Sequence, residues 1–179
     1  MKYLIQTLAV FLLATNYGFS QDSPEKTTDA AVATDQAPLD SLRWMIGEWG
    51  DQSDEGSIGV KCVAYGKRGF LKREFKLQID DENSMEVVQM IGYDPVLERV
   101  QSWTFDTEGG YGTALWSQEG DRWTIKTSFQ LASGETASST NIITKVDDNT
   151  VRWKSVNRQV GGQIQPSVAE STFVRKKAK

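Results

Sequence analysis

Hydrophobic and polar residues alternate along much of the chain from residue 39 onward, with a period of two. The clearest stretch is RWTIKTSFQL (122–131), in which every second residue from Trp123 to Leu131 falls on one side of an extended chain. FLKREFKLQID (70–80) and SIGVKCVAY (57–65) show the same alternation. This pattern is typical of β-strands that bury one face and expose the other to water.

Turn-forming residues separate these alternating runs at short intervals. Gly, Asp and Asn cluster in YGKRG (65–69), DTEGG (106–110) and VGGQ (160–163), where tight hairpins need them. We therefore expect about nine or ten strands, each roughly 6–11 residues long. Only LDSLRWMIG (39–47) indicates a helical turn.

Such a series of hairpins without crossover helices predicts an all-β protein with one antiparallel sheet. A sheet this long hides its edge strands by closing on itself. The prediction is a single up-and-down β-barrel with a short N-terminal helical turn. A two-layer β-sandwich is the alternative architecture.

The first 38 residues are predicted to lie outside the barrel. Residues 1–20 place Lys2 before a short apolar stretch and end in small residues, which is typical of a secretory signal cleaved after Ser20. Residues 21–38 hold acids, Thr, Ala and two prolines but almost nothing large and apolar, as in a disordered linker. We expect a secreted or periplasmic protein whose barrel domain spans 39–176, with no membrane contact after cleavage.

Composition excludes several kinds of chemistry. The formal net charge of −4 argues against a nucleic-acid partner, and Cys62, the single cysteine, has no partner for an internal disulfide. The chain contains no His, which excludes Ser-His-Asp and Cys-His nucleophiles and His-ligated zinc or haem. Acidic turns such as DDEN (80–83) do not match an EF-hand loop. We assign no catalytic residue, metal or cofactor.

The Gly47-Glu48-Trp49 sequence follows the predicted helical turn at the start of the first strand. A helical turn followed by Gly-x-Trp resembles the signature of lipocalins and the wider calycin group. The resemblance implies that Trp49 closes one end of the barrel. It also implies that a cationic side chain near the last strand, here Arg175, covers the Trp49 ring.

The stretch MIGYDPVLERVQSWTFDTEGGYGTALWSQEGDRWTIK (90–126) carries a second resemblance. It is similar to a family of bacterial, exported, lipocalin-like barrel domains of unknown function, through a Gly-aromatic-Asp-Pro turn, Ser-Trp-Thr-Phe-Asp, a Gly-Gly hairpin and a Trp strand. In some relatives such a domain follows a SnoaL-like domain, which this chain lacks. The resemblance implies a fold and an exported location, and it implies no reaction.

Arg73 is the most unusual residue of the predicted barrel interior. It shares a face with Leu71 and Phe75, so we expect it to point inward. A buried guanidinium without a partner is very costly. Two interpretations remain open: a structural ion pair with an inward acid such as Glu86 or Glu170, or a receptor for the anionic group of a ligand.

Other polar and aromatic residues are candidates for a ligand-binding lumen. Together with Arg73 they are Gln89, Trp103, Tyr111, Trp116, Thr127, Trp153 and Asn157. Inward polar groups on apolar faces suit both a ligand-binding cavity and a filled, hydrogen-bonded core. Our hypothesis is an exported, non-catalytic barrel that binds a small apolar or aromatic ligand. The alternatives are a packed interaction or accessory module and an enzyme that uses Arg and carboxylate groups in the lumen. The oligomeric state is not predicted.

Overall fold

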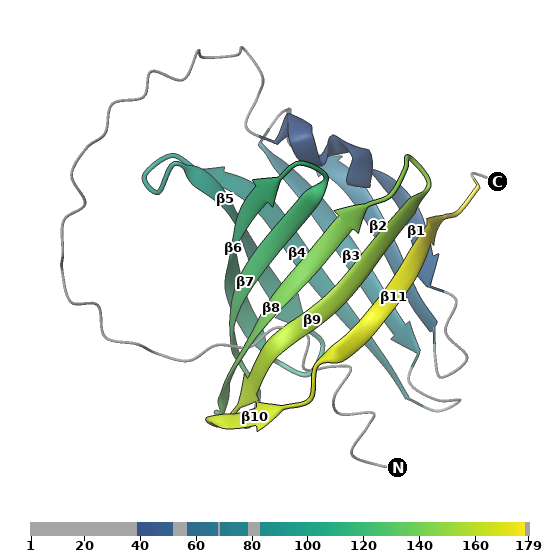
Figure 1. Cartoon of the computed structure of the whole chain (residues 1–179). Coiled ribbons are helices and arrows are strands. Elements are labelled where there is room, and N and C mark those ends of the chain that lie inside the picture. The colour runs from purple at the N-terminus through teal and green to yellow at the C-terminus, as the bar shows by residue number, and fades with distance from the viewer. Residues whose placement is uncertain (1–38, 52–56, 68, 79–82, 178–179) are drawn as a thin grey trace.

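The computed structural model describes residues 39–51, 57–67, 69–78 and 83–177, and its ribbon closes into a barrel (Figure 1). The predicted signal peptide (1–20) and linker (21–38) lie outside the described residues. One sheet accounts for all the described strands, and every pairing in it is antiparallel. The strands are β1 (Gly47–Asp51), β2 (Ser57–Tyr65), β3 (Phe70–Gln78), β4 (Ser84–Asp94), β5 (Arg99–Asp106), β6 (Tyr111–Glu119), β7 (Arg122–Gln130), β8 (Thr136–Lys145), β9 (Thr150–Val160), β10 (Gln163–Gln165) and β11 (Val168–Arg175).

The strand order confirms the predicted up-and-down barrel. Consecutive strands pair from β1 to β9, and β11 then lies between β9 and β1, so the sheet has no free edge in the ring. The short β10 pairs with the last residues of β9. A sandwich is excluded because the hydrogen-bonded ladder runs continuously around the barrel.

The period-two pattern decides which residues fill the barrel. In β7, Trp123, Ile125 and Phe129 are buried, whereas Lys126 and Ser128 between them are exposed. The apolar core therefore lies inside the barrel, on the inner faces of the strands. In the described part of the chain, no helix has the length and hydropathy needed to cross a membrane.

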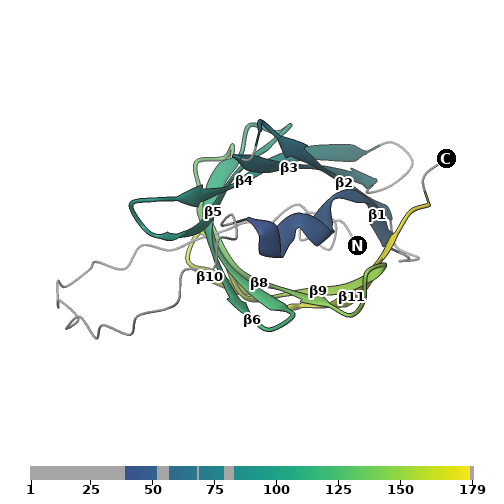
Figure 2. The same ribbon diagram turned by 90° about the horizontal axis from the view of Figure 1, so that it is seen from above.

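One end of the barrel is covered by η1 (Asp40–Met45), a short 3₁₀ helix that lies across the ring of strands (Figure 2). Its Leu42 and Met45 side chains point into the core and are almost fully buried. Trp49 in the middle of β1 donates its indole N–H to the Met45 carbonyl at 2.8 Å. The Trp44 ring meets the Trp49 ring edge-on, with centroids 6.0 Å apart.

Arg175, near the end of β11, fastens this cover to the barrel. Its guanidinium donates to the carbonyls of Trp44 at 2.8 Å, Ile46 at 2.6 Å and Asp148 at 2.8 Å. The guanidinium carbon also lies 4.2 Å from the centre of the Trp49 ring, in cation–π geometry. We call η1, Trp49 and Arg175 together the end plug.

A β-bulge in β9 changes which residues point inward. Asn157 has a φ of 51°, and the β8–β9 register shifts between Ser138 and Thr140. Asn tolerates this left-handed conformation better than most residues. The extra residue leaves Asn157 exposed and turns Arg158 inward, where it is 1% exposed and donates to the Pro166 carbonyl at 2.6 Å. The prediction that Asn157 faces the lumen is therefore wrong.

Candidate functional site

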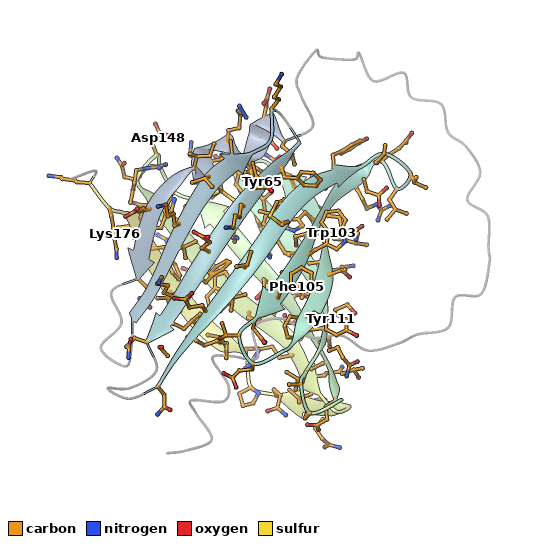
Figure 3. The ribbon with its side chains drawn as sticks, turned by 180° about the vertical axis from the view of Figure 1, so that it is seen from behind. Tyr65, Trp103, Phe105, Tyr111, Asp148 and Lys176 are labelled. Atoms are coloured by element: carbon orange, nitrogen blue, oxygen red, sulfur yellow. The ribbon has the colours of Figure 1, made fainter. Side chains whose placement is uncertain are left out.

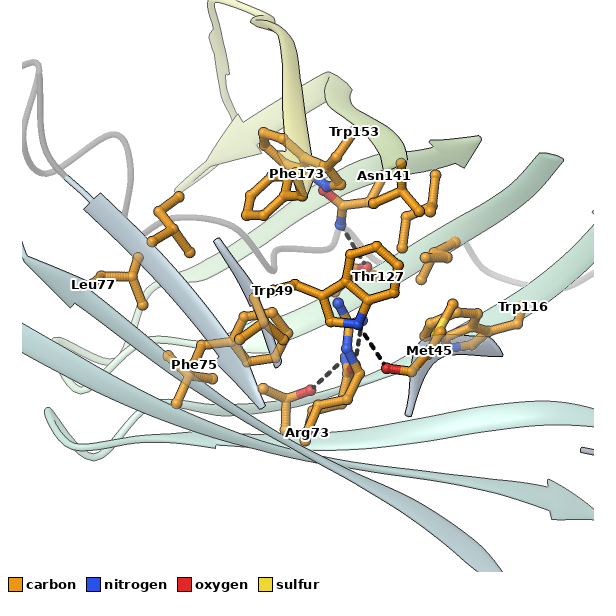
Figure 4. Close-up of a pocket in the computed structure, with 18 of the residues that line it drawn as sticks. Met45, Trp49, Arg73, Phe75, Leu77, Trp116, Thr127, Asn141, Trp153 and Phe173 are labelled. Carbon is orange, nitrogen blue, oxygen red and sulfur yellow. Dashed lines mark hydrogen bonds between the residues drawn. The ribbon is translucent and has the colours of Figure 1, made fainter. Parts of the chain in front are cut away.

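The barrel encloses a cavity of about 120 Å³ (Figure 4). It extends from Trp44 and Met45 of the end plug toward Asp106, the last residue of β5, so it follows the length of the barrel. Apolar cavities of roughly 150 Å³ admit benzene, whereas pockets for drug-sized molecules measure about 300–1,000 Å³. The volume therefore suits a molecule of single-ring size.

Aromatic and aliphatic side chains form most of the cavity wall. Those with aromatic rings are Trp44, Trp49, Phe75, Trp116, Trp153 and Phe173. Six polar or charged residues interrupt this surface: Arg73, Gln89, Thr104, Asp106, Thr127 and Asn141. An apolar chamber with a few fixed polar groups is typical of small-molecule sites.

The polar residues of β3 to β6 form one hydrogen-bonded network around Gln89. Arg73 donates from Nη1 to Gln89 Oε1 at 3.2 Å. Gln89 Nε2 donates in turn to Thr104 Oγ1 at 3.2 Å and to Ser102 Oγ at 3.4 Å. The Trp116 indole N–H donates to the same Ser102 oxygen at 2.9 Å. Each polar side chain in the network is thereby held in place by its neighbours.

A second polar group lies on β7 and β8. Asn141 Nδ2 donates to Thr127 Oγ1 at 3.2 Å and to Ser139 Oγ at 3.1 Å. The strand registers connect the two groups: Ser102 pairs with Ala114, Ala114 with Thr127, and Thr127 with Ser139. The two polar groups therefore lie on neighbouring parts of the inner wall, with Ala114 between them.

Arg73 carries the positive charge of the cavity wall. Its pKa is lowered by burial within the barrel, with a smaller opposing effect from Cys62, yet a guanidinium stays protonated at neutral pH. The guanidinium carbon lies 4.6 Å from the centre of the Phe75 ring. Arg73 forms no ion pair with the described residues.

Neither acid predicted as a partner of Arg73 points inward. Glu86 binds Lys76 at 2.6 Å on the outer surface, and Glu170 lies 3.6 Å from Arg152, also outside. Both carboxylates occupy outward positions of their strands, so the predicted internal ion pair is wrong. The structure gives Arg73 an uncharged partner, the Gln89 amide.

Asp106 is the acidic residue among the described lining residues. Its Oδ1 accepts the backbone N–H of Gly110 at 2.6 Å and of Glu108 at 3.0 Å. These bonds hold the β5–β6 hairpin. The carboxylate therefore has a structural role at the end of β5.

The structure separates the predicted lumen residues into two groups. Arg73, Gln89, Trp116, Thr127 and Trp153 line the cavity. The lumen position predicted for Trp103 and Tyr111 is wrong: both point outward, and Tyr111 is 56% exposed (Figure 3). Asn157 is excluded by the β9 bulge.

The distribution of polar and aromatic residues in β5 explains why the lumen position predicted for Trp103 is wrong. Ser102 and Thr104 are buried and face inward, while Trp103 and Phe105 between them face outward. The Trp103 ring packs edge-on against Phe70, with centroids 6.3 Å apart. Reading the large aromatic residues as the buried face therefore inverts this strand and misses Thr104.

Asn141 is a lining residue that the sequence pattern does not reveal. In β8, TASSTNIITK, polar residues occupy both faces, so alternation gives no direction. The register with β7 is the signal that places it: Asn141 pairs with Ile125, which is on the inner face of a clearly alternating strand.

Cys62 is buried in β2 directly opposite Arg73 in β3. Burial raises the pKa of its thiol, against a smaller lowering effect of Arg73. We expect Cys62 to react with Ellman's reagent at least about a hundredfold more slowly in the native protein than in guanidinium chloride. Burial disfavours the reactive thiolate and also blocks the reagent from reaching it. Equal rates in the two conditions would contradict the buried position.

Within the described ranges, no three His, Cys, Asp or Glu side chains gather in an arrangement able to hold a metal ion. No protein-family model matches this chain, and no curated protein matches it.

Proposed function

We propose that this barrel is an exported, non-catalytic protein that binds a small apolar or aromatic molecule in its lumen. The observation that carries the proposal is the cavity of about 120 Å³ with aromatic walls. The Gly-x-Trp turn at Trp49 and the sequence over 90–126 support membership of the exported, lipocalin-like family that they resemble. The apolar N-terminal stretch before Ser20 supports export.

The size of the cavity limits both the ligand and its affinity. The best very small ligands gain at most about 1.5 kcal/mol per non-hydrogen atom, and most gain much less. A ring of about six to nine such atoms therefore binds with a Kd in the micromolar to millimolar range. Probe molecules must therefore be titrated at micromolar to millimolar concentrations.

Native mass spectrometry of the protein, purified gently from the cells that make it, tests the proposal. We expect a bound species of about 80–200 Da, the range of single-ring molecules that such a cavity admits. Added toluene or benzyl alcohol should also bind and change tryptophan fluorescence, because Trp49, Trp116 and Trp153 line the cavity. Protein that carries no bound molecule after purification and binds neither probe would refute lumen binding.

The outer face of β3 to β6 supports a second candidate function, a protein-interaction module. Phe105 and Tyr111 are paired across β5 and β6 and are 55% and 56% exposed (Figure 3). Exposed aromatic patches on soluble proteins commonly mark contact surfaces. Bare protein that co-purifies with a stoichiometric protein partner would favour this function over lumen binding.

A further inference from the structure

We propose that the lumen ligand is a small monocarboxylate, bound with its carboxylate on Arg73 and its apolar body against the aromatic walls. This inference rests on the proposed function of lumen binding and names the class of ligand. Three features of the cavity carry it: the charge of Arg73, which pairs with no acid of the described residues, the direction of the hydrogen bonds around Gln89, and the apolar remainder of the wall.

The first feature is the charge of Arg73. A guanidinium has five N–H donors, and the structure gives Arg73 one hydrogen bond, from Nη1 to Gln89. The side chain is half-buried and lines the cavity, so its remaining donors are reached from the cavity. A charge removed from bulk water is costly unless an opposite charge meets it. A carboxylate matches the guanidinium fork with two parallel hydrogen bonds.

The second feature is the direction of the hydrogen bonds. Gln89 Oε1 accepts from Arg73, and Gln89 Nε2 donates to Ser102 and Thr104. The reverse orientation of the amide would set its NH₂ group against the guanidinium, donor against donor. The Thr104 hydroxyl accepts from Gln89, so its own proton is directed away from that amide, and Thr104 lines the cavity.

Arg73 and Thr104 therefore direct hydrogen-bond donors toward the cavity. Asp106, the carboxylate among the described lining residues, forms no ion pair with Arg73. Its Oδ1 accepts hydrogen bonds from the backbone N–H groups of Glu108 and Gly110. Arg73 and Thr104 offer donors to a ligand, and the Gln89 oxygen already accepts from Arg73. An anionic acceptor therefore fits the donors of Arg73 and Thr104.

The third feature fixes the rest of the ligand. Phe75, Trp116 and Trp153 supply flat apolar surface in the same cavity. A volume of about 120 Å³ is close to that of cavities that admit a single ring, so the ligand carries no more than one ring. The ligand is therefore an amphipathic anion of the size of benzoate. Phosphorylated sugars and long-chain fatty acids exceed this volume.

Isothermal titration with benzoate and with its neutral analogue benzyl alcohol tests the inference. In the wild type we expect benzoate to bind at least about tenfold more tightly, since hydrogen bonds to charged groups are the stronger ones. Arg73→Met should weaken benzoate binding about 10- to 100-fold and change benzyl alcohol binding less than about threefold. Arg152→Met, which removes an exposed Arg on the outer face of β9, is the matched control and should leave both affinities unchanged.

The outcomes separate the two proposals. Benzyl alcohol binding without any preference for benzoate, or full benzoate affinity in Arg73→Met, would overturn the anion inference and leave lumen binding standing. Failure of both probes to bind would also defeat the proposed function. If Arg73→Met does not fold, the ratio of the two wild-type affinities decides the question without a variant.

Discussion

Replacing Trp49 with alanine is expected to lower the free energy of unfolding by about 3–5 kcal/mol, the usual range for a buried Trp. Trp49 is 5% exposed and contacts every part of the end plug. Its ring lies under Arg175 and against Trp44, and its N–H holds the Met45 carbonyl. Urea denaturation followed by circular dichroism measures the loss.

The control for this variant is Trp103→Ala, which removes the same side chain from the outer face of β5. Trp103 packs against Phe70 but leaves the cavity and the end plug untouched. We expect a loss of about 1 kcal/mol, as for an ordinary surface contact. Equal losses for the two variants would contradict the distinct position assigned to Trp49.

Replacing Gly112 with alanine is expected to destabilise the barrel by about 3 kcal/mol, the upper part of the range for overfilled sites. Gly112 pairs with Phe129 across β6 and β7. An added Cβ would overlap the Ser128 carbonyl oxygen and lie 2.8 Å from the Phe129 Cα, both backbone atoms that cannot rotate away. Thermal unfolding of the variant measures the effect.

Gly59→Ala is the matched control in the same sheet. An added Cβ at Gly59 in β2 meets no atom within 4 Å. The change also reduces the conformational freedom of the unfolded chain, so we expect stability to be unchanged or higher by up to about 1 kcal/mol. A loss at Gly59 as large as that at Gly112 would contradict the assigned β6–β7 contact.

The overall fold could be predicted because its signals are local. In β7 the alternation of apolar and polar residues matches the burial of the strand, and hairpin residues such as Gly109 and Gly120 adopt the positive φ that a tight turn needs. Closure followed from the absence of crossover helices, since an antiparallel sheet of this length hides its edges by closing.

The site could be predicted in part because one of its signals is local and the others are not. Arg73 was identified as inward because Leu71 and Phe75 flank it on one face, yet its partner depends on the β3–β4 register, which places Gln89 opposite. β5 buries small polar residues and exposes aromatic ones, the reverse of the expected pattern. The bulge at Asn157 shifts the alternation of β9 by one residue, and the pattern of apolar and polar residues does not predict this shift.

A crystal structure of the protein grown with benzoate tests ligand binding in the lumen most directly. We expect a closed ten-strand barrel with one ring in the lumen near Phe75 and Trp116, and with its carboxylate within hydrogen-bond distance of Arg73. A lumen filled by the protein's own side chains, or Arg73 paired with an acid of the chain and no ligand beside it, would contradict anion binding in the lumen.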